Sequence, residues 1–375
     1  MKIAQICPRY SPDIGGVETH VKEISERLVK AGHDVEVITT DPTGQLRKQE
    51  IINGVRVIRF RSFAPGNAYY FAPQIYTYLK KHDYDIIHAH SYHAFPAFFA
   101  SLSRHSGKFV FTPHYHRHGH TAFRDLLHKP YRLFGKIIFS RADSVICVSE
   151  YEKKLVESDF EVAAKTVKIP NGINLTEFEG LRQPEKSLNR NAEREKILLY
   201  VGRLEEYKGV QYIIQSLPEL QDFRLRIIGK GPYEAELRNM AKSSGVEARV
   251  EWLKDLSRKE LLERYADADI FLMLSSHEAY GIAVAEALAA EIPCIVAKGS
   301  ALEEFVDGRN CIGIENPVSK EKVVRALQDL MENKRGQSKK EQEKVDEKNY
   351  GLYSIIDWDE VTQKIITVYE STFNQ

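Results

Sequence analysis

The chain has 375 residues, enough for two domains that each bury their own core. Its 53 basic residues balance its 53 acidic residues, so no overall charge points to nucleic acid as a partner. The cysteines lack the spacing of a zinc or disulfide framework, which predicts reduced core thiols in a cytoplasmic protein. These are Cys7, Cys147, Cys294 and Cys311.

Apolar runs of strand length recur through the first half, and several are separated by amphipathic helical patterns. The expected strands are 2–7, 34–40, 55–60, 85–91, 108–114, 144–149 and 167–170. This alternation predicts an α/β domain with a doubly wound parallel sheet over residues 1–180.

The second half repeats the pattern after a polar, charged segment at 181–195 that is typical of a linker. Its expected strands begin at 196 and continue at 224–229, 250–253, 269–275, 294–298 and 311–314. We therefore expect a second Rossmann-like domain over 196–355. A dense charge run at 332–349 is typical of a solvated surface.

Gly15 and Gly16 follow the first expected strand and open an amphipathic helix. Glycines at such a turn allow a phosphate to approach the backbone N–H groups of the helix N-terminus. An ordinary tight turn has the same sequence, so this pair alone does not indicate a ligand.

Nine of the thirteen histidines lie between His82 and His120. His88, His90 and His114 fall on or just after expected strands. A ligand site is the favoured interpretation of the cluster, whereas buried structural hydrogen bonds are favoured for His88 and His90. A metal site is a third reading, but no carboxylate or cysteine joins them with ligand spacing, so we expect none.

Residues 104–141 contain eight Lys or Arg and a single acid, Asp125, interleaved with aromatic and aliphatic residues. A basic amphipathic stretch of this kind suits an anionic membrane surface or a phosphorylated acceptor. A helix pair with a basic outer face is the alternative.

Arg203 and Lys208 lie just beyond the first strand of the second half. Glu278 and Glu286 lie eight positions apart, one before and one inside an expected helix that follows the strand at 269–275. Ligands bind at the carboxyl ends of strands in open α/β sheets, so these residues suit a diphosphate and sugar or ribose hydroxyls. Solvated cations and dipole-stabilised acids are the alternatives.

Taken together, these motifs resemble the retaining glycosyltransferases of family four, which have the GT-B fold of two facing Rossmann-like domains. The resemblance covers almost the whole chain. It rests on Gly15-Gly16, Asp85 to His90, Thr112-Pro113-His114, Ile169 to Asn174, Val201-Gly202-Arg203 with Lys208-Gly209, Ile228 to Pro232, and the Glu278/Glu286 pair, in the family's order.

The resemblance implies a role for each matching residue. Arg203 and Lys208 hold the donor diphosphate, Glu286 holds the ribose, and Glu278 and His114 lie beside the transferred sugar. The donor-binding set also includes Gly15, Gly16, Asn171, Gly229, Leu253, Ala279, Tyr280, Gly281 and Ile282. Residues 356–375 resemble the family's terminal helix, which returns to the first domain.

The implied function is retaining transfer of a hexose from a UDP- or GDP-linked donor to a hydroxyl of a glycan, glycolipid or small molecule. No metal or cofactor is expected, and contact with the inner membrane face through residues 104–141 stays open. A GT-B epimerase or phosphorylase is one alternative. A non-catalytic, membrane-associated module that binds sugar nucleotides is another.

Overall fold

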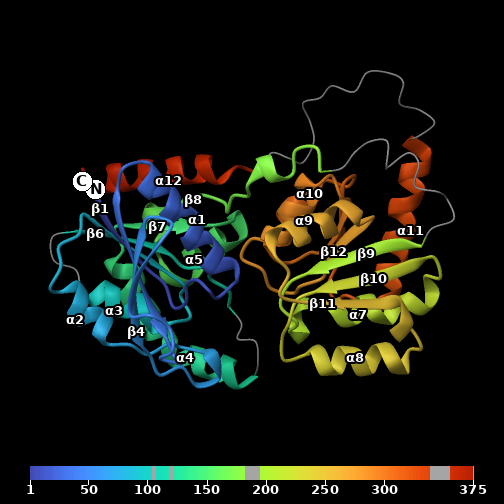
Figure 1. The fold of residues 1–375 in the computed structure, drawn as a ribbon, viewed down its shortest axis with the longest axis horizontal. Helices are drawn as coiled ribbons and strands as arrows, with labels where there is room; N and C mark the ends of the chain where they lie inside the picture. The colour runs from blue at the N-terminus through green and yellow to red at the C-terminus, as the bar shows by residue number, and fades with distance from the viewer. Residues whose placement is uncertain (104–106, 118–121, 182–194, 338–354, 375) are drawn as a thin grey trace. The chain divides into compact units, whose positions relative to one another are not determined.

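The computed structural model describes residues 1–103, 107–117, 122–181, 195–337 and 355–374, without the side chains of 67, 122–130 and 333–337. The chain divides into two compact units (Figure 1). The first comprises Met1–Gly172 and Ile356–Gln375, and the second comprises Ile173–Ile355. The N-terminal segment of the first unit thus ends at Gly172, whereas the predicted first domain extends to residue 180. Most of the predicted linker (182–194) and of the charge run (338–349) lies outside the described residues.

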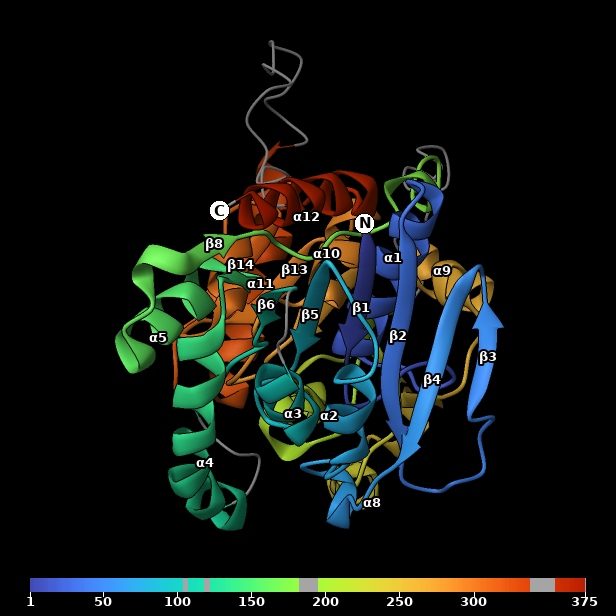
Figure 2. The same ribbon diagram turned by 90° about the vertical axis from the view of Figure 1, so that its left-hand side faces the viewer.

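The first unit is built on an eight-stranded sheet in the order β3-β4-β2-β1-β5-β6-β7-β8, most of which Figure 2 shows face-on. Neighbouring strands are parallel except β3 and β4, so the carboxyl ends of the parallel strands share one edge. The strands are β1 (Lys2–Ile6), β2 (Asp34–Asp41), β3 (Gln49–Ile52), β4 (Val55–Arg61), β5 (Ile86–His90), β6 (Lys108–Thr112), β7 (Ser144–Cys147) and β8 (Thr166–Lys168).

Strand β3 is absent from the sequence prediction because its four residues are half exposed and too few to show a period. It pairs antiparallel with β4 across a turn formed by Asn53 and Gly54, which have φ angles of 49° and 84°. Positive φ at both positions is the signature of a two-residue hairpin turn, and Asn-Gly is its commonest sequence. The turn residues therefore carried a signal for this hairpin.

Helices cover both faces of the first sheet. They are α1 (Gly16–Lys30), α2 (Gln74–Leu79), α3 (Phe95–Ser103), α4 (Ala122–Arg141), α5 (Glu150–Phe160) and α12 (Trp358–Phe373), with short helices η1 (Pro65–Asn67) and η2 (Ala163–Lys165). Alternate strand residues point to opposite faces. Ile3 packs in the core with α1 and α12, whereas its neighbour Ala4 packs in the core with α2 to α5. Burial on both faces explains the continuous apolar strands.

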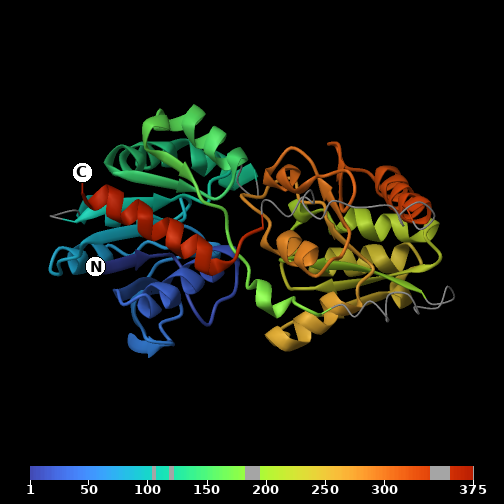
Figure 3. The same cartoon turned by 90° about the horizontal axis from the view of Figure 1, so that it is seen from above.

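The terminal helix α12 belongs to the first unit, as the resemblance implied. Figure 3 shows this red helix beside the first sheet, and it packs against α1. Its cap is Asp357, whose side chain accepts a hydrogen bond from Asp359 N at 2.8 Å. The hydroxyl of Tyr369 lies 3.0 Å from Gln5 Nε2 and 2.6 Å from His88 Nδ1. The helix is thus joined to strands β1 and β5.

The second unit has a six-stranded, fully parallel sheet in the order β11-β10-β9-β12-β13-β14. The strands are β9 (Lys196–Val201), β10 (Phe223–Ile228), β11 (Val250–Leu253), β12 (Ile270–Met273), β13 (Cys294–Ala297) and β14 (Cys311–Ile314). The helices are α7 (Val210–Ser216), α8 (Glu234–Ser243), α9 (Arg258–Asp267), α10 (Ile282–Ala289) and α11 (Lys320–Gln337), with short helices η3 (Leu175–Glu177), η4 (Glu206–Lys208), η5 (Leu217–Glu219), η6 (Glu247–Arg249) and η7 (Ala301–Phe305).

Both units are therefore Rossmann-like, which confirms the predicted α/β fold class. All four cysteines are free and buried, as predicted. No helix among the described residues is both long enough and apolar enough to cross a membrane.

Candidate active site

The carboxyl end of β9 carries the two cations predicted to hold a diphosphate. Lys208 Nζ lies 2.5 Å from Glu278 Oε1, and the two side chains are only 12% and 17% exposed. Burial lowers the pKa of Lys208, but the Glu278 carboxylate and Tyr207 more than reverse this effect, so the pKa is raised. Lys208 is therefore a cation at neutral pH, and its charge is screened little by solvent.

Arg203 differs from Lys208 in its exposure. Its side chain is 55% exposed, and its Nη2 lies 2.7 Å from Glu205 Oε1. An exposed ion pair contributes little to stability, so this guanidinium can exchange Glu205 for a phosphate at low cost. The edge of the sheet thus offers one buried point charge and one exposed planar fork, two complementary ways to bind phosphate oxygens.

Glu286 lies one turn inside α10, where the sequence placed it, and is held by two residues that sequence reasoning did not select. Arg258 Nη1 lies 2.6 Å from Glu286 Oε1, and the Tyr265 hydroxyl donates to Oε2 at 2.9 Å. Arg258 also pairs with Glu177 at 2.6 Å. Each carboxylate oxygen has a second lone pair, so Glu286 can still accept from vicinal hydroxyls.

The loop from Glu278 to Ile282 leads from β12 into α10. Gly281 is the N-cap at a φ of 114°, and a Cβ there would lie 2.6 Å from Leu302 Cδ2, so only glycine fits. Tyr280 is buried against Phe305, and the carbonyl of Glu278 accepts from Ala301 N at 3.2 Å. Ala279 and Ile282 are half-buried. The loop is therefore fixed, with the N–H groups of the first helical turn beside Glu278.

Gly229 and Leu253 lie at the same edge, at the ends of β10 and β11. Gly229 N donates to Leu253 O at 2.9 Å. The φ of Gly229 is 150°, and a Cβ there would lie 1.9 Å from Gly202 O, so its backbone packs directly on the loop after β9. Because Gly202 and Gly229 have no side chains, only backbone lies at this contact between the ends of β9 and β10.

In the first unit, Gly15 is the N-cap of α1 and Gly16 is the first residue of the helix. The same helix carries His20, which sequence reasoning overlooked because it lies outside the histidine-rich segment. His20 Nδ1 lies 2.7 Å from Asn171 Oδ1, so the predicted donor-binding residue Asn171 orients a buried imidazole.

His20, His90 and His114 form a cluster in which His20 and His90 are buried and His114 is half-buried. Their ring centroids are 5.3 Å apart for His20 and His90, 5.2 Å for His20 and His114, and 6.1 Å for His90 and His114. One buried nitrogen of each ring, namely His20 Nε2, His90 Nδ1 and His114 Nε2, has no hydrogen-bond partner among the described residues. The cluster thus presents three unsatisfied imidazole nitrogens.

Burial determines the charge of this histidine cluster. It lowers the pKa of His20 to about 4, against a smaller opposing effect of Asn171, and it holds the pKa values of His90 and His114 well below their usual range. All three rings are neutral at physiological pH, able to bond hydroxyl groups. One potential ligand nitrogen from each lies within 4.8 Å of the others, so the cluster also has the geometry of a metal site.

His114 has a φ of 46°, which is uncommon for a residue with a side chain. The following residue is fixed by Glu152, whose Oε1 accepts from Tyr115 N at 2.5 Å and whose Oε2 accepts from Val148 N at 2.6 Å. Glu152 is fully buried in α5. It therefore ties the loop after β6 to the loop after β7 and holds the backbone beside His114.

His88, by contrast, has both ring nitrogens satisfied, by Tyr369 and by Thr112 Oγ1 at 2.8 Å. It is a structural histidine, as the sequence reading favoured. His90 fits that reading on one side only, since its Nε2 lies 2.7 Å from Gln5 Oε1.

Comparison with known proteins gives the family. The model described as Glycosyltransferase Family 4 matches residues 14–177, and that described as Glycosyl transferases group 1 matches residues 182–351. An uncharacterised glycosyltransferase of Methanocaldococcus jannaschii is 31% identical over 82% of this chain and 83% of its own. The chain belongs to glycosyltransferase family 4. It is a glycosyltransferase that uses a nucleotide-sugar donor.

The names of two further relatives contain a lipid. A subunit of phosphatidylinositol N-acetylglucosaminyltransferase from Saccharomyces cerevisiae is 26% identical over 81% of this chain and 69% of its own. Alpha-monoglucosyldiacylglycerol synthase from Streptococcus pneumoniae is 26% identical over 79% of this chain and 70% of its own.

Solved structures share the GT-B fold of this glycosyltransferase. Sucrose-phosphate synthase of Thermosynechococcus elongatus has a TM-score of 0.78 at 19% identity, covering 100% of this chain and 99% of its own. An Anabaena protein, HepE, in complex with UDP-glucose has a TM-score of 0.77 at 19% identity, covering 99% and 100%. These likenesses confirm the predicted fold.

The basic stretch of this glycosyltransferase is less uniform than its sequence indicates. Arg117 is engaged by Asp159, with Nε–Oδ2 at 2.9 Å and Nη2–Oδ1 at 3.0 Å. On α4, Leu133 and Ile137 are 66% and 37% exposed. Arg132 and Lys136 lie next to them and are also exposed. Among the side chains of the stretch that the structure describes, only these four place exposed apolar groups next to exposed cations.

Proposed function

We propose that this glycosyltransferase moves a hexose from a UDP- or GDP-linked donor to an acceptor hydroxyl, with retention at the anomeric carbon and without a metal. The buried Lys208 beside Glu278 is the observation that carries the proposal. A buried cation that is in place before the reaction stabilises negative charge as it develops on a leaving diphosphate. Arg203 adds a second, exposed cation on the same loop.

The proposed step breaks the bond between the anomeric carbon and the diphosphate oxygen and forms a bond from that carbon to the acceptor oxygen. The acceptor's proton passes to the departing phosphate oxygen on the same face of the sugar, so no separate general base is needed. Glu286 holds the ribose, and Glu278 and the neutral His114 orient the sugar. No cofactor other than the donor substrate takes part.

The acceptor is proposed to be a hydroxylated ring borne on a lipid. Two observations support this class: the lipids in the names of two relatives, and the exposed Leu133 and Ile137, each directly after an exposed cation, Arg132 or Lys136. Apolar side chains flanked by cations suit the boundary between headgroups and acyl chains of an anionic membrane. The enzyme would then act while bound to the membrane surface.

A thermal-shift screen against nucleoside diphosphate sugars tests the donor. A true donor at one hundred times its Kd stabilises the protein by about 2.7 kcal/mol through mass action. Release of free nucleoside diphosphate on adding acceptors, with the anomeric configuration of the product read by NMR, then tests transfer and retention. Tight donor binding without even slow donor hydrolysis would instead indicate a non-catalytic binding module.

Co-sedimentation with phosphatidylglycerol vesicles tests the membrane contact. Each cation near an anionic surface contributes about 1 kcal/mol, so Arg132→Gln with Lys136→Gln should weaken binding about 30-fold. The control is Lys242→Gln with Arg325→Gln, two exposed cations on the second unit. Equal binding of wild type and both double variants would exclude this helix as the membrane contact.

A further inference from the structure

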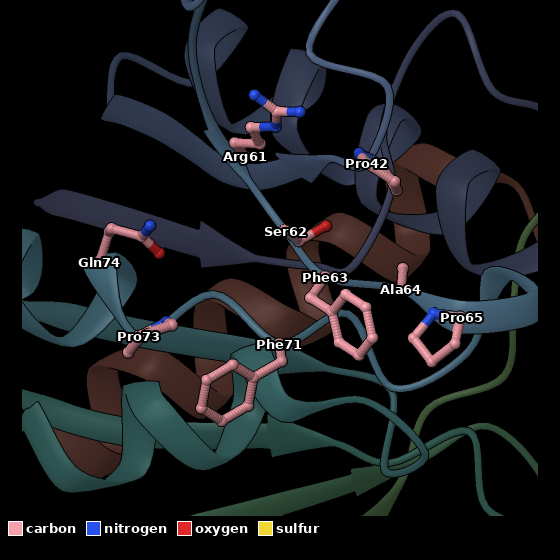
Figure 4. Close-up of a pocket in the computed structure, with 9 residues that line it drawn as sticks. All are labelled: Pro42, Arg61, Ser62, Phe63, Ala64, Pro65, Phe71, Pro73 and Gln74. Atoms are coloured by element: carbon pink, nitrogen blue, oxygen red, sulfur yellow. The ribbon is translucent and has the colours of Figure 1, made fainter.

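A cavity in the first unit is not explained by the donor site. It has a volume of about 580 Å³. It is lined by Pro42 and by residues of the segment from Arg61 to Gln74 (Figure 4). Pro42 follows β2, and Arg61 ends β4. The cavity therefore lies at the carboxyl edge of the first sheet, the edge where open α/β sheets bind ligands.

Two exposed aromatic rings form one wall of this cavity. Phe63 and Phe71 are 71% and 44% exposed. Their backbones exchange hydrogen bonds of 3.0 and 2.9 Å as an antiparallel pair, so both side chains leave the same face. Figure 4 shows the rings beside each other. The chain thus presents a preformed aromatic platform to solvent.

One ring of the platform, that of Phe71, packs against helix α3. The ring of Phe71 makes edge-to-face contacts with Phe95 and Phe99 of α3, at centroid distances of 5.4 and 5.2 Å. Phe95 N also donates to Tyr69 O at 2.8 Å. A ring fixed in this way loses little conformational freedom when a ligand stacks on it, which favours binding.

Three polar side chains around the platform have unused hydrogen-bonding capacity. Ser62 is 8% exposed, and its Oγ is buried without a partner among the described residues. Arg61 is exposed and forms no ion pair with any residue that the structure describes, and Gln74 supplies an amide. A buried hydroxyl without a partner costs free energy, so a polar ligand would be bound favourably here.

Apolar faces interleaved with hydroxyl, amide and guanidinium groups suit a sugar, whose ring stacks by its C–H face while its hydroxyls bond at the rim. A lipid chain would leave these polar groups without partners. A membrane surface would need cations around the rings, but Arg61 is the only cation among the residues that line the cavity.

The position of the cavity along the sheet indicates which residue of a longer sugar chain it would bind. Its strand β4 lies three places from β5, which carries His90, in the order β4-β2-β1-β5. At the usual strand spacing this is about 14 Å, a length that two or three sugar residues span. A sugar bound at the β4 end of the cavity would thus lie two or three sugar rings away from one reacting beside the histidine cluster.

Resting on the proposed glycosyl transfer, we propose that this cavity is a distal acceptor subsite. It binds sugar residues of the acceptor that lie beyond the ring receiving the hexose. The acceptor is then an oligosaccharide attached to a lipid, and its length is recognised by Phe63 and Phe71.

Binding to an array of neutral and anionic oligosaccharides of one to four residues tests the subsite. The full-length wild type should bind one or more members of three or four residues. Phe63→Ala, at a mostly exposed position that should not affect folding, should weaken binding at least threefold, and Phe63→Ala with Phe71→Ala at least tenfold. The control is Ile51→Ala, at a 75% exposed apolar residue on β3 outside the cavity, which should bind like wild type.

The proposal is overturned if wild type binds no oligosaccharide, or if both Phe variants bind as wild type does. It is also overturned if the variants lose binding only to phosphatidylglycerol vesicles or to nucleotides. Donor hydrolysis without acceptor separates this outcome from failure of the proposed function. If the enzyme hydrolyses the donor but binds no oligosaccharide, the proposed transferase function stands and the proposed subsite is rejected. If oligosaccharide binding depends on Phe63 but the protein neither binds nor hydrolyses a donor, the sugar site stands and the proposed transferase function is rejected.

Discussion

Lys208 Nζ and Glu278 Oε1 lie 2.5 Å apart, so the cation expected to bind the donor diphosphate is paired with the carboxylate expected to lie beside the sugar. We expect Lys208→Ala to reduce kcat/KM by about 10²- to 10³-fold, because a preorganised charge at the leaving group is lost. Initial rates of nucleoside diphosphate release measure this effect. The control is Lys298→Ala, which removes a lysine paired with the exposed Glu315 in the same unit. A Lys208→Ala enzyme within threefold of wild type would remove Lys208 from the mechanism.

The strands around this pair could be predicted from sequence because each is buried on both faces and therefore reads as a continuous apolar run. Strand β3 could not, since its burial alternates over only four residues, although Asn53-Gly54 marked its turn. Contacts between residues far apart in the sequence could not be predicted either. Nothing near Tyr369 in the sequence indicates that its hydroxyl meets His88, 281 positions earlier.

Glu286 is expected to accept hydrogen bonds from the ribose hydroxyls of the donor. If so, wild type should bind the preferred nucleoside diphosphate more tightly than its 2′-deoxy analogue, by about tenfold, and Glu286→Ala should bind both equally. Calorimetry on the four combinations gives a double-mutant cycle that isolates the contact. The exposed Glu291→Ala, just after α10, is the matched control and should keep the discrimination. Equal discrimination in Glu286→Ala would assign the ribose to another residue.

The partners of Glu286 show why this site was only partly predictable. The family motif contains the carboxylate itself, whereas Arg258 and Tyr265 reach it from α9, 28 and 21 positions earlier. Ser257 caps that helix, so the start of the helix could be predicted from the sequence. The side chains of the helix that contact α10 could not. His20 was missed for the same reason, because only the fold brings this residue of α1 beside His90 of β5 and His114, which follows β6.

The histidine cluster allows a direct test of metal independence. Dialysis against a chelator should leave turnover within about twofold of the untreated enzyme, because Lys208 and Arg203 supply the positive charge. Elemental analysis of the purified protein is the second measurement and should find less than one metal ion per chain. Loss of turnover that one equivalent of zinc restores in wild type, but not in His20→Gln, would show that His20, His90 and His114 hold a required metal.

Glu152 should give the fold a distinctive pH dependence. Burial raises its pKa to about 8 from an ordinary value of 4.5, and the N–H groups of Tyr115 and Val148 offset this only in part. Between about pH 5 and pH 8 the unfolded chain releases this proton while the folded chain retains it. Stability from this group is therefore complete below pH 4.5 and is lost as the pH rises through 8, by at most about 1.4 kcal/mol per pH unit.

Urea unfolding of wild type and Glu152→Gln from pH 5 to pH 9 measures this contribution. The free energy of unfolding of wild type should fall relative to that of Glu152→Gln up to about pH 8 and then run parallel to it. Glu161→Gln, at the exposed end of the same helix, should retain the wild-type dependence. A constant difference between wild type and Glu152→Gln would mean that Glu152 is ionised throughout, held by its two backbone N–H groups. Because Tyr115 follows His114, Glu152→Gln should also raise the KM for the donor, an effect that Glu161→Gln should not share.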